Sequence, residues 1–371
     1  MSSEVQGALL RSEIEFGLNV LRQQNLDKSF VFSPASISFG LSLVHAAASG
    51  DTQSEIRDVL LRGSTDEQLE NHMSNLLKQI SKTMSKSTKI KVVNHAFCWD
   101  VYPIKEDYLK EINRLYNAGA TPLDFIRKKK DSADAINKFI EENTEGLIKS
   151  NLTEKYIKEY LVVVYTNTIY FKARWLEQFF AHSTEKFDFH LSPESKRSID
   201  FLQTHGHRSY SENEQFQVLH LRYLDKSFAM SIFLPKTRFG LKDALIKLTP
   251  STILKLLSTE TSKYMMIKIP KWKIESSIDL EKTLKALGVV RSFDIFNPDF
   301  TKLADDLHGL TKMDHLATIE VNEQGTTAAA ATILRLRGGG IPPEPIDFTA
   351  DHPFLFIITK DMHPIFVGLH Y

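Results

Sequence analysis

The chain has 371 residues, of which 42% are hydrophobic and 25% charged, enough to bury a core of ordinary globular size. Its 46 basic residues balance 46 acidic ones, so we expect neither nucleic acid nor a membrane surface as a partner. A single cysteine, Cys98, excludes an internal disulfide. Its apolar neighbours indicate a buried packing residue rather than a nucleophile.

The N-terminal segment predicts an amphipathic helix rather than a secretion signal. Leu9, Leu10, Ile14, Leu18 and Leu21 share one broad helical face. Acidic residues come early, and no basic region precedes an apolar one with a small-residue cleavage site. We therefore expect a cytoplasmic protein, with export by an unconventional route left open.

Residues 30–50 contain no Asp, Glu, Lys or Arg, which raises the question of a membrane span. The segment also carries five serines, a proline and His45, and is too polar for lipid. It predicts a buried helix in which Ser33 is the N-cap, Pro34 occupies the first position and Gly50 ends the helix.

The rest of the chain changes from helical to strand patterns near residue 160. Residues 54–61 and 133–148 have a helical period. The later runs YLVVVYTNTIYF, SFAMSIFLP and MMIKIPKWKI are rich in β-branched and aromatic residues. Since no linker or repeat divides the chain, we expect one α+β domain over residues 1–371.

The connection from Thr318 to Phe348 is unusually long for a compact domain. After Gly325 come two consecutive threonines, four alanines, the run ILRLR, three glycines and three prolines. The triple glycine and the prolines prevent a helix or strand from continuing. Connections of this length are uncommon unless they are functional or disordered.

The residues of this connection alternate as those of a strand do. Counting in twos from Thr326, one set is small near the start and then apolar: Thr326, Ala328, Ala330, Thr332, Leu334 and Leu336. The other set ends in Arg335 and Arg337. This pattern predicts a half-buried strand with its leucines toward the core and its arginines toward water. The loop therefore has the sequence of a strand that it can become.

Five segments together resemble the serpin superfamily over nearly the whole chain. The run EQGTTAAAAT, from Glu323 to Thr332, is similar to the serpin hinge. FVFSPASISFGLSLV, NTIYFKARW, IPKWKI and DHPFLFII resemble other serpin motifs. The resemblance is to the inhibitory, intracellular type without a signal peptide.

The resemblance implies a serpin fold with about nine helices around three β-sheets and an exposed reactive-centre loop at about residues 323–344. It also implies a suicide-substrate mechanism in which a protease cleaves the loop and forms an acyl-enzyme. The cleaved loop then enters the central sheet and traps the protease, an order–disorder switch that releases stored strain. Such a protein is a monomer, needs no cofactor and is not an enzyme; its partner is the target protease, held in a covalent acyl complex.

The hinge that the resemblance implies has the small side chains that insertion needs. It comprises Glu323, Gly325, Thr326, Thr327, Ala328, Ala329, Ala330 and Ala331. Gly325 can take up a large dihedral change, and a charge or a proline at Thr326 should block entry. Two positions depart from the family: Thr327 replaces a common acidic residue, and Ala173 stands where glycine is usual.

Control of sheet opening is implied for a second set of residues: Ser33, Ser36, Asn167, Trp175, Lys271 and His315. By resemblance, His315 hydrogen-bonds near Asn167 beneath the opening. Glu323 and Lys271 are expected to form a contact near Trp175 that restrains premature opening.

The cleaved bond has two candidate positions. The loop length of the family implies Gly339–Gly340, whereas Arg337–Gly338 suits a trypsin-like serine protease or a papain-like cysteine protease. Cleavage after Arg337 would shorten the inserted segment and let more protease escape. The run LRLRGG is identical to the C-terminus of ubiquitin, so a ubiquitin-type cysteine protease that cuts after Gly339 is a further candidate.

The remaining signals are weaker. Lys78, Lys82 and Lys86 form a candidate polyanion site, for which a solvated lysine face is the competing interpretation. The 13 histidines show no metal-ligand spacing, and no catalytic or phosphate-binding motif is present. The rivals to inhibition are a non-inhibitory serpin cleaved as a substrate and, with less support, an enzyme.

Overall fold

A computed structural model of the protein describes residues 3–82, 87–296, 298–326 and 344–371. Several predicted site residues lie outside these ranges: Lys86 and the loop positions Thr327, Ala328, Ala329, Ala330, Ala331, Arg337, Gly338, Gly339 and Gly340. The part of the hinge from Glu323 to Thr326 and all the residues predicted to control sheet opening are described.

The described chain is α+β, with most helices in its first half, as predicted. The α-helices are α1 (Ser3–Arg22), α2 (Pro34–Ala47), α3 (Gly50–Leu60), α4 (Asp66–Ser81), α5 (Glu106–Tyr116), α6 (Lys129–Asn143), α7 (Leu241–Lys247), α8 (Pro250–Ser258) and α9 (Leu280–Leu287). Short 3-10 helices are η1 (Glu154–Tyr156), η2 (Ala181–Ser183) and η3 (Arg291–Phe293). The expectation of about nine helices is confirmed for the described residues.

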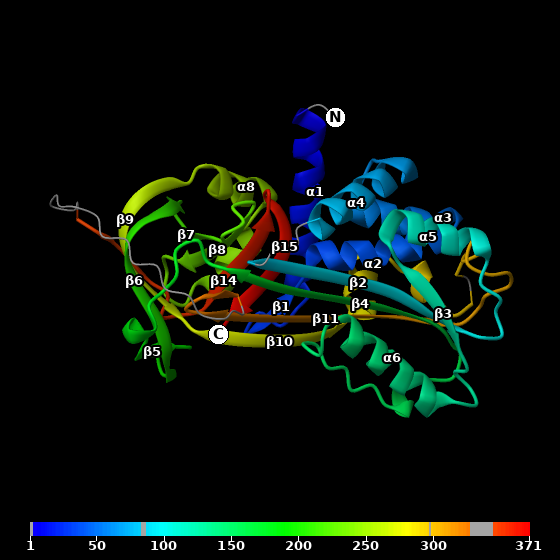
Figure 1. Cartoon of the computed structure of the whole chain (residues 1–371). Coiled ribbons are helices and arrows are strands. Elements are labelled where there is room, and N and C mark those ends of the chain that lie inside the picture. The colour runs from blue at the N-terminus through cyan, green and yellow to red at the C-terminus, as the bar shows by residue number, and fades with distance from the viewer. Residues whose placement is uncertain (1–2, 83–86, 297, 327–343) are drawn as a thin grey trace.

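A six-stranded sheet crosses the molecule (Figure 1). Its order is β10 (Trp272–Asp279), β11 (Leu310–Asn322), β12 (Gly325–Thr326), β4 (Leu161–Arg174), β2 (Thr88–Trp99) and β3 (Gly119–Leu123). Where the two-residue strand β12 is absent, β11 pairs directly with β4. Helix α2 lies on one side of this sheet and α6 on the other (Figure 1).

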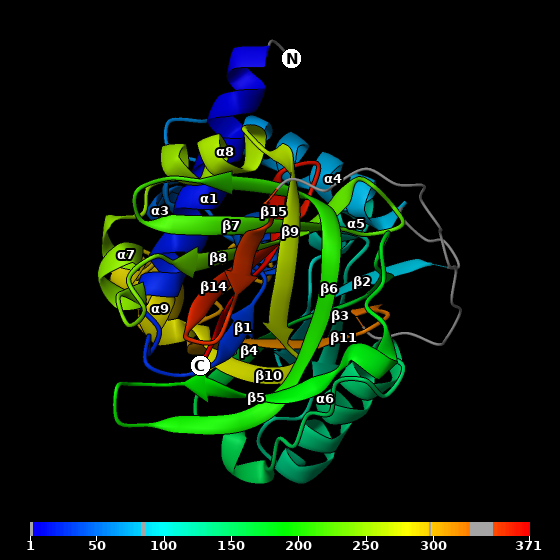
Figure 2. The ribbon, with the colours of Figure 1, turned by 90° about the vertical axis from the view of Figure 1, so that its left-hand side faces the viewer.

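The other strands form a nine-stranded sheet. Its order is β1 (Phe30–Phe32), β15 (His363–His370), β14 (Phe354–Lys360), β8 (Phe228–Pro235), β7 (Phe216–Arg222), β6 (Lys196–Glu212), β9 (Thr261–Pro270) and β13 (Ile346–Thr349), with β5 (Glu185–His190) paired to β6. The long strand β6 meets β7 near one end and β5 near the other (Figure 2). Two of the three expected sheets are therefore joined through β6 into one hydrogen-bonded unit.

Helix α2 is buried along its whole length, which explains its lack of charged residues. As predicted, Ser33 caps it: the Ser33 Oγ accepts a 3.0 Å hydrogen bond from the Ser36 N–H, and Pro34 occupies the first turn. The expected end at Gly50 is wrong, because α2 ends at Ala47 and Gly50 begins α3 with a φ of 54°. Among the described helices, none combines the length and apolar character needed to cross a bilayer.

Candidate functional site

The contact between β11 and β4 is the feature around which the predicted site residues gather. The two strands run parallel and pair from Thr311–Val163 to Thr318–Tyr170; we call this stretch the seam. Beyond it, β12 lies between the same two strands and is antiparallel to both. Thr326 faces Val321 of β11 on one side and Ala173 of β4 on the other. The chain therefore starts an additional strand at this end, which we call the hinge end.

Gly325 and Thr326 suit this narrow position. Gly325 has a φ of 155°, and a Cβ there would overlap the Ala173 carbonyl oxygen, so only glycine fits without a shift. Thr326 is fully buried, and its Oγ1 lies 2.9 Å from the hydroxyl oxygen of Tyr223. The Tyr223 ring stacks on Trp175 with a centroid separation of 4.5 Å. The Thr326 side chain thus has a hydrogen-bond partner in a dry environment.

Glu323 holds the hinge end through side-chain and backbone contacts. The Lys271 Nζ donates to its Oε1 at 3.1 Å, and the Thr184 Oγ1 donates to the same atom at 2.9 Å. Burial acts to raise the pKa of Glu323. Hydrogen bonds from its own backbone N–H, Lys271 and Thr184 outweigh burial and place that pKa below its ordinary value. The expected contact between Glu323 and Lys271 is therefore present.

Trp175 also anchors this end of β11. Its indole N–H donates to the Asn322 carbonyl at 3.0 Å, and its backbone N–H donates to the Gln324 carbonyl at 2.9 Å. Since Trp175 follows β4 directly, these bonds connect the end of β4 to the turn between β11 and β12.

A buried polar network lies within the seam, where α2 begins against the sheet. His315 of β11 and Asn167 of β4 are direct neighbours in the strand pairing. The His315 Nδ1–H donates to the Asn167 Oδ1 at 2.6 Å, and the Ser36 Oγ donates to the same oxygen at 3.0 Å. On the other side of the imidazole, Nε2 accepts the Ser33 N–H at 2.9 Å. We call Ser33, Ser36, Asn167 and His315, with Asn94, the seam network.

The seam network leaves its imidazole neutral. Because Nε2 accepts a hydrogen bond, the proton of His315 resides on Nδ1. Burial lowers the pKa of His315 to about 3. The amide of Asn167 is also saturated, since its Nδ2 donates to the Ser36 carbonyl at 2.5 Å and to the Asn94 side chain. Separating β11 from β4 here would break a buried hydrogen bond between the two strands.

The structure thus divides the predicted residues into two groups. Ser33, Ser36, Asn167 and His315 come together in the seam network, whereas Trp175, Lys271, Glu323, Gly325 and Thr326 come together at the hinge end. Both groups lie along the same pair of strands, β11 and β4.

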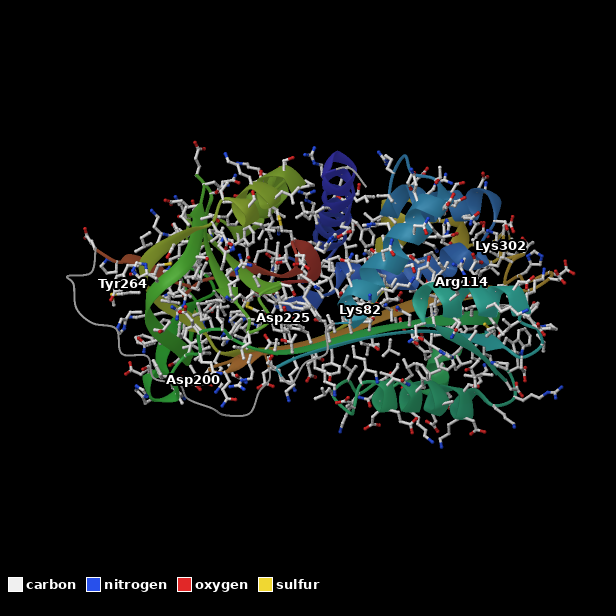
Figure 3. All side chains as sticks on the ribbon, turned by 45° about the horizontal axis from the view of Figure 1, so that its top comes forward. Lys82, Arg114, Asp200, Asp225, Tyr264 and Lys302 are labelled. Atoms are coloured by element: carbon white, nitrogen blue, oxygen red, sulfur yellow. The ribbon has the colours of Figure 1, made fainter. Side chains whose placement is uncertain are left out.

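Two other predicted features are placed away from the seam. Cys98 is buried, and burial raises its pKa to about 12, as suits a packing residue. Lys78 and Lys82 are exposed at the end of α4, where Lys82 can be located in Figure 3. Lys89, which follows in sequence, pairs with Glu145.

Sequence reasoning missed three partners of these groups: Asn94, Tyr223 and Thr184. Asn94 carried a signal, since it is an amide within an apolar strand and lies opposite Asn167 in the pairing of β2 with β4. No local pattern in the sequence indicates Tyr223 or Thr184 as a partner, because each reaches the hinge end from a distant part of the chain.

Comparison with known proteins agrees with this geometry. The family described as serpin (serine protease inhibitor) matches residues 11–371. The chain belongs to the serpin family. Serpin-ZX of Arabidopsis thaliana is 30% identical, with 97% of this chain and 96% of that protein aligned.

Solved serpin structures have the same fold. Serpin48 of the insect Tenebrio molitor, described as a highly specific serpin, is 28% identical, with a TM-score of 0.87 over 100% of this chain and 98% of that chain. Human thyroxine-binding globulin in complex with thyroxine is 22% identical, with a TM-score of 0.88 over 97% of each chain. The second likeness shows the fold alone.

Proposed function

We propose that this serpin is a suicide-substrate inhibitor whose cleaved loop enters the seam and traps the acylated protease. The observation that carries the proposal is strand β12, in which Gly325 and Thr326 already lie between β11 and β4. An additional strand needs only to extend from this position into the seam.

The register of β12 supports insertion of the following residues. Continued as a regular antiparallel strand, it places position 332 opposite His315 and Asn167, and position 334 opposite Met313 and Tyr165. The sequence has Thr332 and Leu334 there. Since directly opposed residues share a face, Thr332 would meet the seam network and Leu334 would meet the buried Met313 and Tyr165. The alternation of the loop therefore matches the polarity of the seam.

The expected gain in free energy is large enough to drive a mechanical step. About a dozen new hydrogen-bonded positions at ~0.5–1.5 kcal/mol each give on the order of 10 kcal/mol. Burial of Leu334 and Leu336 adds roughly 1.5–3 kcal/mol for each side chain.

The target is proposed from the loop sequence. A trypsin-like serine protease or a papain-like cysteine protease would cut after Arg337, and a ubiquitin-type cysteine protease would cut after Gly339. A cytoplasmic location, export by an unconventional route, a monomeric state and a polyanion at Lys78, Lys82 and Lys86 stay predictions from the sequence.

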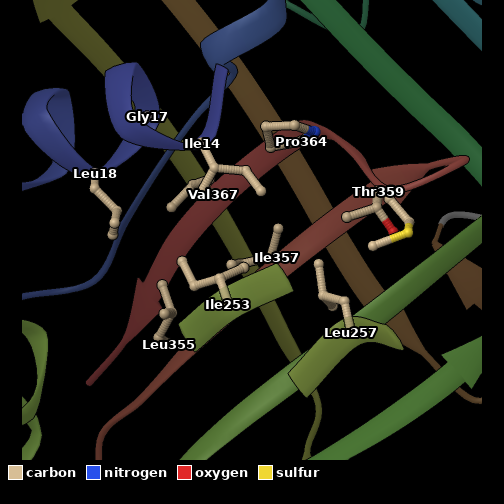
Figure 4. A pocket seen from close by; sticks show the side chains of 11 residues that line it. Ile14, Gly17, Leu18, Ile253, Leu257, Leu355, Ile357, Thr359, Pro364 and Val367 are labelled. Carbon is tan, nitrogen blue, oxygen red and sulfur yellow. The ribbon is translucent and has the colours of Figure 1, made fainter. Parts of the chain in front are cut away.

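A carrier function has less support. Between α1, α8 and strands β14 and β15 lies an apolar cavity of about 10 Å³, lined by side chains such as Ile14, Leu257 and Ile357 (Figure 4). Small-molecule sites are commonly ~300–1,000 Å³. This cavity could hold a water molecule at most.

Incubation with three proteases tests the proposal: trypsin, a cathepsin L-like protease and a deubiquitinating enzyme. We expect an adduct that survives denaturing electrophoresis with at least one of them, and mass spectrometry of the released C-terminal fragment identifies the bond. The same protease with its nucleophile blocked beforehand is the control and should give no adduct. Cleavage by all three without an adduct would instead indicate a serpin that is only a substrate.

A further inference from the structure

Glu13 of α1 is a buried carboxylate whose two oxygens each accept a hydrogen bond from a histidine. The Nε2–H of His72 in α4 donates to Oε1 at 2.6 Å, and the Nδ1–H of His363 in β15 donates to Oε2 at 2.7 Å. Since an ionised carboxylate only accepts, each imidazole must carry a proton on the bonding nitrogen. The three side chains are at most 13% exposed, so water screens their contacts little. We call these three residues the clasp.

The clasp holds the end of a strained hairpin. Helix α1 lies beside β15 (Figure 1), and His363 is the first residue of β15, directly after the turn that joins it to β14. In this turn Asp361 and Met362 have φ values of 46° and 72°, in the left-handed region that residues other than glycine rarely adopt. The clasp therefore connects the turn of the β14–β15 hairpin to two helices that are distant in the sequence.

Packing around this end of the hairpin is incomplete. Pro364, next to His363, borders two cavities of about 10 Å³ each. One is the cavity beside α8 (Figure 4), and the other lies between α1, α2 and α4, where Glu13 forms part of the wall. Atoms that line a void lack van der Waals partners on that side. The polar contacts of the clasp are therefore more important for docking the hairpin than they would be in a fully packed interface.

Few charged groups from the surrounding elements face His363. Glu13 of α1 and Asp361 of the turn attract its proton, whereas Lys360 repels it. The Lys360 Nζ donates to the Asp361 carboxylate at 2.9 Å, so these two charges largely cancel. Helix α2 contains no Asp, Glu, Lys or Arg, and Lys255, the one charged residue of α8, is exposed. Glu13 is therefore the main counter-ion of His363.

The contacts of the clasp shift two pKa values in opposite directions. Burial acts to raise the pKa of Glu13, but the hydrogen bonds from His363 and His72 outweigh it and leave this pKa below its ordinary value. Burial acts to lower the pKa of His363, but the hydrogen bond and the charge of Glu13 outweigh it, so this pKa is raised. His72 also faces His363, with 6.5 Å between ring centroids. When His363 loses its extra proton, the buried carboxylate loses that counter-ion, which is costly.

We propose that the clasp is a proton-dependent device that holds the β14–β15 hairpin against α1 and α4 more firmly in mildly acidic than in alkaline solution. Because the pKa of His363 is raised on folding, its contribution is complete below the ordinary value of 6.5 and is lost as the pH rises through the raised value. Because the pKa of Glu13 is lowered, its contribution is complete above the ordinary value of 4.5 and is lost as the pH falls through the lowered value. The device depends neither on the target protease nor on the insertion proposed above.

The titration of His363 tests the charge coupling in the full-length protein. The NMR signals of its ring are identified by their loss in His363→Asn. We expect a midpoint above the ordinary value of 6.5, and in Glu13→Gln a fall of this midpoint by about one pH unit or more, a tenfold loss of proton affinity. The ring of the exposed His308 is the internal control and should titrate alike in both proteins. A His363 midpoint at or below 6.5 in the natural protein would overturn the proposal, whether or not Glu13→Gln folds.

Hydrogen exchange measured by mass spectrometry tests the effect on the hairpin. His363→Asn keeps an amide donor near the position of Nδ1 but cannot take up a proton. Peptides that cover α1 and the turn at Asp361 should exchange about tenfold faster in this variant than in the natural protein at about pH 5.5, and within about twofold at about pH 8.5. Comparing both proteins at the same pH removes the intrinsic pH dependence of exchange.

Two controls separate the clasp from general destabilisation. Peptides from α6, on the far side of the six-stranded sheet, should exchange alike in both proteins, and His308→Asn should match the natural protein at both pH values. An equal difference at both pH values would show that His363 has only a structural role. No difference at either would show that the clasp does not hold the hairpin. Both results would overturn the proposal, and if His363→Asn does not fold, the His363 midpoint in Glu13→Gln and in the natural protein decides the case.

Discussion

The two ends of the β11–β4 contact are held together in different ways. At the hinge end, β12 separates the strands, and the contacts are backbone bonds, an aromatic stack and an ion pair near the surface. In the seam, the strands pair directly, and a buried network of neutral polar groups connects them to α2. Exposed ion pairs contribute little stability, whereas breaking a buried, saturated network is costly.

This difference indicates an order of opening. We expect the hinge end to yield first, since its ion pair is partly exposed through Lys271 and an additional strand is already started there. In the proposed insertion, the seam network would resist until the incoming strand supplies replacement hydrogen bonds, as Thr332 would do opposite His315 and Asn167. Three substitutions test this contrast.

The largest effect is expected for Thr326→Arg at the hinge end. Thr326 is fully buried against Tyr223, and a guanidinium there would cost several kcal/mol, so insertion should slow by ~100-fold or more. The variant should be cleaved as a substrate without a stable adduct on denaturing gels. Thr327→Arg is the matched control, because the next position of a strand points to the opposite face, and it should still form adduct. Equal trapping by the two arginine variants would contradict the register.

An intermediate effect is expected for Asn167→Ala in the seam network. The change removes the hydrogen bonds of one amide to Ser36, His315 and Asn94 and leaves their buried groups without this partner. The free energy of unfolding should fall by ~2–4 kcal/mol, measured by denaturant unfolding. Ser38→Ala removes only a local 2.9 Å bond to the Pro34 carbonyl within α2 and should cost less than ~1 kcal/mol. Similar losses for both variants would show that the network does not hold the seam.

The smallest effect is expected for Glu323→Lys. The substitution replaces an ion pair with Lys271 by a like-charge contact and removes the bond from Thr184. A loss of ~1 kcal/mol would speed heat-induced oligomerisation about fivefold. Glu323→Gln can keep an acceptor for Thr184 and should give a smaller increase. An unchanged rate of oligomerisation in Glu323→Lys would show that this contact does not restrain opening.

Local features of the fold could be predicted from the sequence because they depend on neighbouring residues. Ser33 and Pro34 predicted the start of α2, and the apolar runs after residue 160 predicted strands. The end of α2 could not be predicted in this way. The sequence indicates an end at Gly50, whereas the helix ends at Ala47 because Ala48 is extended. The sequence also did not predict that β6 joins two of the expected sheets. This joining depends on how far one strand of 17 residues extends beyond its neighbours.

The amino-acid sequence alone determined the alternation of the loop, the small residues of the hinge and the buried character of α2. These follow from side-chain size and period along one segment. Only the tertiary structure decided that Gly325 and Thr326 stand between β11 and β4, and that Asn94 completes the seam network. The physical reason is that register and burial arise between segments far apart in the chain, such as Ser33 and His315 at 282 positions, and no local pattern encodes that separation.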